Sequence, residues 1–232
     1  GRGIVELHGP KMIPIEGRGH ERVDLRIHRI DALSRSFWPF PERPISVDES
    51  KRPPGPGEEP PEHEHALGYV SKTLVRRHLR NLGSPDVSRI VELPLKGQGR
   101  AANFGLDLGN HIDEPGTYLV GIRPLDSSAR RSWMRLQVSD LALSTVEGVN
   151  SVDFFVSSLS SARSVAGAKI SLQGVRDVRE RSSKSRFTTI VSGVSEMDGS
   201  FSWRPPSNEA WRKMRIRRIV LGKGDDQLVL NP

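Results

Sequence analysis

Apolar and polar residues alternate along much of the chain, in runs of the length that β-strands have. The clearest run is residues 22–30, where Val23, Leu25 and Ile27 alternate with polar residues, as in a strand with one buried face. Other strands are expected in the first part of the chain at residues 3–7, 12–15, 89–95, 104–108, 116–123 and 133–138. Further on, the same pattern predicts strands at residues 139–143, 152–156, 169–172, 187–191, 201–203, 216–221 and 227–230.

Two segments of the first part depart from this alternation. Residues 39–65 are rich in Pro, Glu and Gly, a composition that builds neither a sheet ladder nor a helix, so we expect an extended loop there. Residues 69–82 carry apolar residues at helical spacing and are followed by Gly83, which predicts one short amphipathic helix.

These elements predict an all-β protein made of two tandem sandwiches of the immunoglobulin or fibronectin III type. The expected domains are residues 1–138, with the loop and helix inserted at about residues 34–88, and residues 139–232. A length of 232 residues suits two ordinary domains. The 22 glycines and 17 prolines suit short strands joined by tight turns better than a helical fold.

A net charge of +7 raises the question of nucleic-acid binding. Basic residues are spread over both halves and are dense only at Arg76, Arg77 and Arg80 and at residues 212–218. This distribution favours an ordinary solvated surface over nucleic acid, and it leaves an acidic protein partner or an envelope polyanion as the alternative.

Few residues offer catalytic or metal-binding chemistry. The chain has no cysteine, and its one compact metal-ligand candidate, EHEH at residues 62–65, lies in the expected loop, which favours a solvated linker. Asp198, Asp225 and Asp226 adjoin turn glycines, which favours a role in hairpins over calcium binding or acid–base catalysis. His111 is the last histidine, so the second domain lacks the usual base for a nucleophile. The glycines at residues 97–99 do not open a phosphate-binding helix. We therefore predict no enzyme activity, no cofactor and no metal.

Two features are candidates for contact with a partner. Trp38 and Phe40 form an aromatic cluster beside the loop; packing beneath the loop is the favoured interpretation, and an exposed anchor is the alternative. Arg76, Arg77 and Arg80 give the predicted helix a basic face, which either covers a sheet edge or meets a neighbouring domain or an acidic partner.

A series of motifs resembles the macroglobulin-like domains of bacterial alpha-2-macroglobulins. PGTYLV at residues 115–120 resembles the family's PGxYLV strand, and VSDLAL at 138–143 resembles its VTDLGL passage between domains. VAGAKISL at 165–172, SEMDGSF at 195–201 and the close around GDDQLVL at 224–230 follow in the family's order. Residues 23–31 resemble a strand of a preceding domain, whereas Ser164 replaces a usual proline and the Arg-rich turn at 175–186 is long.

The resemblance implies a non-catalytic scaffold fragment of a protease inhibitor that traps its target. The partners it implies are neighbouring domains of the parent chain, target proteases met by the full-length protein, and other envelope proteins. It also implies a periplasmic or envelope location and leaves a membrane-anchored parent protein open. The family's thioester needs a cysteine, which this chain lacks. The alternatives are a tandem binding module of a surface adhesin or receptor, and an accessory domain of an enzyme. No apolar run of 18 residues and no signal-peptide pattern occurs, so we expect a soluble fragment.

Overall fold

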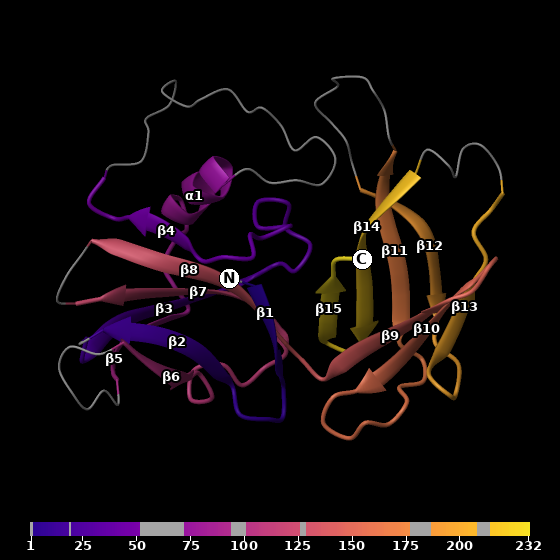
Figure 1. The fold of residues 1–232 in the computed structure, drawn as a ribbon, viewed down its shortest axis with the longest axis horizontal. Coiled ribbons are helices and arrows are strands. Elements are labelled where there is room, and N and C mark those ends of the chain that lie inside the picture. The colour runs from indigo at the N-terminus through magenta and orange to yellow at the C-terminus, as the bar shows by residue number, and fades with distance from the viewer. Residues whose placement is uncertain are drawn as a thin grey trace. The chain divides into compact units, whose positions relative to one another are not determined.

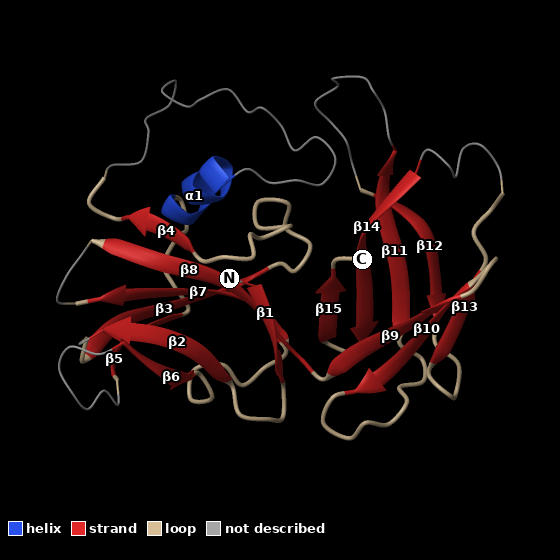
Figure 2. Ribbon diagram, viewed as in Figure 1, coloured by secondary structure: helices blue, strands red, loops and turns tan. Residues whose placement is uncertain are grey.

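The computed structural model describes residues 2–18, 20–51, 72–93, 101–125, 129–176, 187–207 and 214–232. The described residues divide into two compact units, which we call unit 1 (residues 2–138) and unit 2 (residues 139–232). Among the described residues, the regular structure of both units consists of strands, apart from one short helix in unit 1 (Figures 1 and 2). The predicted fold class, mostly β with a single short helix, is confirmed.

Unit 1 is built around an antiparallel sheet of six strands. The strand order is β1-β8-β7-β3-β5, and β4 pairs with the first residues of β8. A two-stranded ribbon, β2 with β6, packs on one face of this sheet, and the helix α1 packs near β4. The elements of unit 1 are β1 (Arg2–Glu6), β2 (Met12–Arg18), β3 (Arg22–Ile30), β4 (Ile45–Asp48), α1 (Lys72–Arg80), β5 (Val87–Glu92), β6 (Ala101–Asp107), β7 (Gly116–Pro124) and β8 (Arg130–Ser139).

Unit 2 is a sandwich of two antiparallel sheets. One sheet has the order β13-β10-β9 and the other the order β12-β11-β14-β15. Its strands are β9 (Leu141–Glu147), β10 (Val152–Ser158), β11 (Lys169–Arg176), β12 (Thr188–Val194), β13 (Ser200–Trp203), β14 (Met214–Lys223) and β15 (Asp226–Leu230). Inward-facing residues of both sheets, among them Phe154, Leu172 and Leu221, form one apolar core.

The sequence prediction was wrong about part of the Pro-rich segment. Ile45–Asp48 forms β4, which pairs residue by residue with β8 from Ile45 opposite Trp133 to Asp48 opposite Arg130. Ile45 and Val47 are buried, whereas Ser46 and Asp48 are not, so the strand has the alternation of a half-buried strand. It forms even though Pro41 and Pro44 precede it. Residues 52–65 of the expected loop, with the EHEH motif, lie outside the described residues. The same holds for the glycines at 97–99 and for most of the Arg-rich turn.

Candidate functional site

The central sheet of unit 1 has two chemically different faces. Along β3, Val23, Leu25 and Ile27 point to an apolar core that the β2–β6 ribbon covers. The alternate residues, Asp24 and His28, are also buried, so the opposite face holds polar groups away from water. We call this opposite face, with Asp24, Arg26, His28, Leu119, Gly121, Arg123, Arg131, Trp133 and Arg135, the charged face.

Five charged side chains form one ion-pair cluster on the charged face. Arg131 of β8 is fully buried, and its Nη2 donates to Asp24 Oδ2 at 2.6 Å while its Nε donates to Glu49 Oε1 at 2.6 Å. Arg123 Nη2 donates to Asp24 Oδ2 at 2.9 Å, and Arg26 reaches Asp24 and Glu49 at 3.4 and 3.5 Å. The cluster joins β3, β7, β8 and the residue that follows β4, so it ties four segments distant in sequence.

Backbone groups complete the coordination of Arg131. Its Nη1 donates to the carbonyl oxygens of Asp24 at 2.7 Å and Gly121 at 3.2 Å. Gly121 leaves the room for this arrangement, because a Cβ there would lie 2.6 Å from Arg131 Cδ and 2.7 Å from the Trp133 ring. A buried charge that is paired and hydrogen-bonded in this way is tolerated, whereas removing one partner is costly.

The two carboxylates of the cluster are unsuited to catalysis or metal binding. Burial by itself raises the pKa of Asp24, but the hydrogen bonds from Arg131 and Arg123, with the nearby positive charges, outweigh burial and hold that pKa below its ordinary value. Asp24 is therefore ionised at neutral pH and neutralised by three guanidinium groups, so it is not a base with a raised pKa. Among the described residues, no group of three or more potential ligands gathers to hold a metal ion.

Aromatic side chains continue the charged face toward α1. The Trp133 ring lies 5.6 Å from the ring of His28, and the guanidinium of Arg135 lies 4.8 Å from the ring of Trp38. Burial lowers the pKa of His28, and the nearby negative charge of Asp86 offsets this lowering only in part. His28 is therefore a buried neutral side chain at neutral pH.

The structure places the predicted partner residues in two different environments. Trp38 is 4 % exposed and Phe40 is 2 % exposed, so the interpretation of these aromatics as exposed anchors is wrong for this structure. Phe40 packs in a cluster with Ile45 and Val75, because the segment that contains it crosses the charged face beneath α1. Arg76 is exposed on α1, and Arg77 and Arg80 are half-buried. These three arginines share a helix and do not form a site with Trp38.

The PGTYLV motif builds a corner at the start of β7. Tyr118 donates its hydroxyl to the carbonyl oxygen of Glu114 at 2.9 Å, four residues upstream, which is the bond of a tyrosine corner in immunoglobulin-like sandwiches. Arg29 of β3 donates to the Pro115 carbonyl oxygen at 3.0 Å and also pairs with Glu114. A Cβ on Gly116 would lie within 3.4 Å of both Arg29 and Tyr118, so glycine gives this corner its compactness.

The VAGAK and MDGS motifs form interlocking turns in unit 2. Ser195 Oγ donates to the Val165 carbonyl oxygen at 2.6 Å and accepts from the Ala168 amide at 2.9 Å. Asp198 Oδ1 accepts from the amide of Ser200 at 2.9 Å, and Gly199 adopts a φ of 81°. The Asp-Gly pair therefore serves the backbone of a tight turn, and the predicted turn role of Asp198 is confirmed. The turn joins β12 to β13, which lie in different sheets, so it is not the hairpin that the sequence predicted.

The GDDQLVL motif holds the chain where it enters unit 2. Gly224 and Asp225 form the turn between β14 and β15, with Gly224 at a φ of 59°. Asp226 Oδ2 accepts from the amide of Asp140 at 2.8 Å, and Asp140 Oδ1 accepts from the amide of Ser160 at 2.8 Å. The first residues of unit 2 are therefore fixed to two of its hairpins.

Comparisons with solved structures show a match over the whole chain. No protein-family model and no curated protein matches the sequence. The structure of native alpha-2-macroglobulin from Escherichia coli spanning domains NIE-MG1 matches with a TM-score of 0.62 and 15 % identity, over 99 % of this chain and 93 % of that chain. The fold of the present chain therefore matches that of the N-terminal NIE and MG1 domains of bacterial alpha-2-macroglobulin.

Two longer alpha-2-macroglobulin structures match in the same way. The Escherichia coli structure spanning domains MG0-NIE-MG1 matches with a TM-score of 0.54 and 16 % identity, over 100 % of this chain and 62 % of that chain. A Salmonella alpha-2-macroglobulin mutant also matches at a TM-score of 0.54 and 16 % identity, and this chain spans 11 % of its length. The domains that resemble this chain are thus parts of a larger alpha-2-macroglobulin with neighbouring domains.

Sequence reasoning did not find the ion-pair cluster of unit 1. Asp24 and Arg26 looked like the solvated positions of a half-buried strand, because alternation does not distinguish a charged buried face from a wet one. A partial signal was the opposite charges of Asp24 and Arg123 at polar positions of two expected strands, but Arg131 precedes the expected strand at residues 133–138 and the sequence did not place it in the sheet.

Proposed function

We propose that this chain is a non-catalytic scaffold fragment of a bacterial alpha-2-macroglobulin-like protein that traps proteases. The observation that carries the proposal is the match to domains NIE-MG1 of Escherichia coli alpha-2-macroglobulin, which covers 99 % of this chain and 93 % of that chain. The two units would then be consecutive domains of a longer protein, with a boundary near residue 138 and with neighbouring domains as partners.

The chemistry of the motifs that carry the family resemblance supports a scaffold role. Each motif that carries the family resemblance supplies a corner, a turn or a chain-entry contact: Tyr118 at the corner, Gly199 at the turn and Asp226 at the entry. The carboxylates of Asp24 and Glu49, which share Arg131 as a partner, are neutralised by arginine. A periplasmic or envelope location and contact with target proteases belong to the same proposal, as properties of the full-length protein. No helix among the described residues is long and apolar enough to cross a membrane.

The trapping proposal is tested on the full-length protein that contains this chain. The protein is incubated with an active endoprotease, and residual cleavage of a small peptide substrate is compared with cleavage of a large protein substrate. A caged protease keeps its activity on the small substrate and loses it on the large one. Retention of both activities against a panel of endoproteases contradicts the proposal.

The contribution of this chain is tested with a variant pair in the same assay. Arg131→Met removes the buried centre of the cluster and is expected to reduce trapping, because the scaffold loses a folded domain. Arg163→Met changes an exposed residue of unit 2 and is the matched control. The isolated 232-residue chain should neither hydrolyse substrates nor cage the protease; hydrolysis that maps to it would contradict a scaffold role.

A further inference from the structure

Helix α1 carries an unusual concentration of positive charge. Its nine residues, KTLVRRHLR, include five basic ones and no acidic one. The basic residues are Lys72, Arg76, Arg77, His78 and Arg80. Lys72, Arg76 and Arg80 follow one another at intervals of four residues, so they form a stripe along one side of the helix.

This stripe is unfavourable for the helix itself. Like charges four residues apart repel each other, and a lysine in the first turn faces the positive end of the helix dipole. Acidic residues, which would relieve both effects, are absent from the first turn. Arg80, in the last turn, is favoured by the dipole, so the unfavourable charges are those of Lys72 and Arg76. A role outside helix stability explains these two better than a solvated face does.

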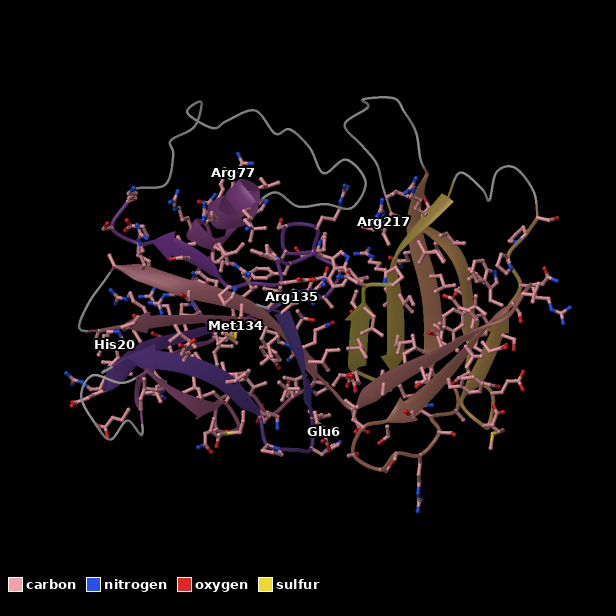
Figure 3. All side chains as sticks on the ribbon, viewed as in Figure 1. Glu6, His20, Arg77, Met134, Arg135 and Arg217 are labelled. Carbon is pink, nitrogen blue, oxygen red and sulfur yellow. The ribbon has the colours of Figure 1, made fainter. Side chains whose placement is uncertain are left out.

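Packing fixes the orientation of the stripe. Leu74, Val75 and Leu79 are buried in the cluster that also contains β4, so this side of α1 is fixed against the sheet. Lys72 and Arg76 are exposed, and no ion pair joins either of them to another residue in the described part of the chain. Arg80 is half-buried, and within the same part its Nε is buried without an acceptor. Figure 3 shows the helix with Arg77 labelled.

We propose that the stripe of Lys72, Arg76 and Arg80 docks an extended acidic segment of a partner protein. Residues four apart on a helix rise about 6 Å along its axis. Alternate residues of an extended chain are about 6.6 Å apart, so carboxylates at every second position match the stripe. Arginine pairs with carboxylates through two parallel hydrogen bonds, which suits this partner.

Nucleic acid is a poorer match to the same surface. Single-stranded nucleic acid is bound by basic grooves that also offer aromatic side chains for base stacking. The aromatic residues packed nearest α1, Phe37 and Phe40, are buried, and Phe37 faces the His78 ring at 6.0 Å. Within the described residues, the stripe therefore offers charge at a regular spacing without a stacking surface.

The test measures binding of the 232-residue chain to a fluorescein-labelled peptide in which Glu alternates with Ser, by fluorescence anisotropy. The variant Lys72→Glu/Arg76→Glu is expected to weaken binding by about tenfold or more at low ionic strength. The same variant should not destabilise α1, because it places a carboxylate in the first turn and another four residues before Arg80. Thermal unfolding of the variant is therefore expected at the wild-type temperature or above it.

The control is Arg163→Glu/Arg204→Glu, which makes the same change in net charge at two exposed positions of unit 2. Wild-type affinity in this control supports the proposal, and an equal loss in both variants overturns it in favour of general charge attraction. Equal affinity for a peptide with the same glutamates in one block overturns the spacing argument. Tighter binding of a thymidine oligonucleotide through the same two residues overturns the assignment to an acidic protein segment. Trapping of proteases is a separate measurement on the parent protein, so either proposal can fail alone.

Discussion

Unit 1 and unit 2 are both built from antiparallel strands, but they place their charged side chains differently. The central sheet of unit 1 buries charge on one face, where Arg131 is fully buried between Asp24 and Glu49. Unit 2 encloses an apolar core between its sheets, and the polar side chains of Ser195, Asp198 and Asp226 hold its turns. A buried arginine of this unit, Arg218 of β14, donates to the neutral side chain of Gln173 at 2.6 Å.

The difference shows two ways to specify strand pairing. In unit 1 the guanidinium of Arg131 reaches two other strands and the end of a third, so the ion pairs hold together segments as distant in sequence as Asp24 and Arg131. In unit 2 tight turns with glycines at positive φ connect consecutive strands: Gly224 joins the paired strands β14 and β15, and Gly199 carries the chain from β12 to β13 in the other sheet. The first solution is sensitive to the loss of one charge, and the second to the loss of one backbone conformation.

The largest effect should come from breaking the cluster of unit 1. Arg131→Met is expected to lower the free energy of unfolding of unit 1 by about 3–5 kcal/mol, because Asp24 and Glu49 lose their buried partner. Urea unfolding with hydrogen exchange resolved by peptide separates the two units. Arg26→Met, which removes longer and more exposed contacts of the same cluster, should cost about 1 kcal/mol or less. Equal losses in the two variants would contradict the assignment of Arg131 as the centre of the cluster.

The next effect tests the tight turns of unit 2. Gly199→Ala is expected to destabilise unit 2 by about 2–3 kcal/mol, since the backbone has a φ of 81° and the new Cβ would lie 2.5 Å from the Val156 carbonyl oxygen. Gly224→Ala is the matched control, because its φ is 59° and nothing lies within 4 Å of a Cβ there. That control should cost about 1 kcal/mol, from the left-handed conformation alone. The measurement is the same peptide-resolved unfolding, and unit 1 should not change.

A smaller effect is expected where the chain enters unit 2. Asp226→Ala removes the acceptor for the Asp140 amide and should cost about 1–2 kcal/mol, whereas Asp226→Asn keeps an acceptor oxygen and should cost less. Faster hydrogen exchange of the Asp140 amide in the alanine variant, measured by NMR, localises the loss. An unchanged exchange rate would show that Asp226 does not hold this amide.

The contrast between the units also explains how far sequence reasoning reached. The predicted helix and the strand at residues 22–30 were found because their periodicity reports burial directly. The turn role of Asp198 was found because Asp-Gly is a local signal. Strand β4 was missed, since four residues between prolines are too short for a periodic pattern and only pairing with β8 stabilises them. The cluster around Arg131 was missed for a related reason: its members are far apart in the sequence and meet only in the folded sheet.

The smallest effect is a difference in acid sensitivity between the units. The arginines hold the pKa of Asp24 below its ordinary value despite burial, so the folded state binds this proton more weakly than the unfolded state. The stabilisation by Asp24 is therefore complete above the ordinary pKa of 3.8 and is lost as the pH falls below it, through the folded pKa. Unfolding measured from pH 6 downward should show unit 1 losing stability in this range. In Asp24→Asn, unit 1 starts less stable and its pH dependence is flatter, because the residue that replaces Asp24 does not titrate. The same slope in Asp24→Asn as in the wild type would assign the acid sensitivity to other carboxylates and remove the electrostatic basis for the contrast between the units.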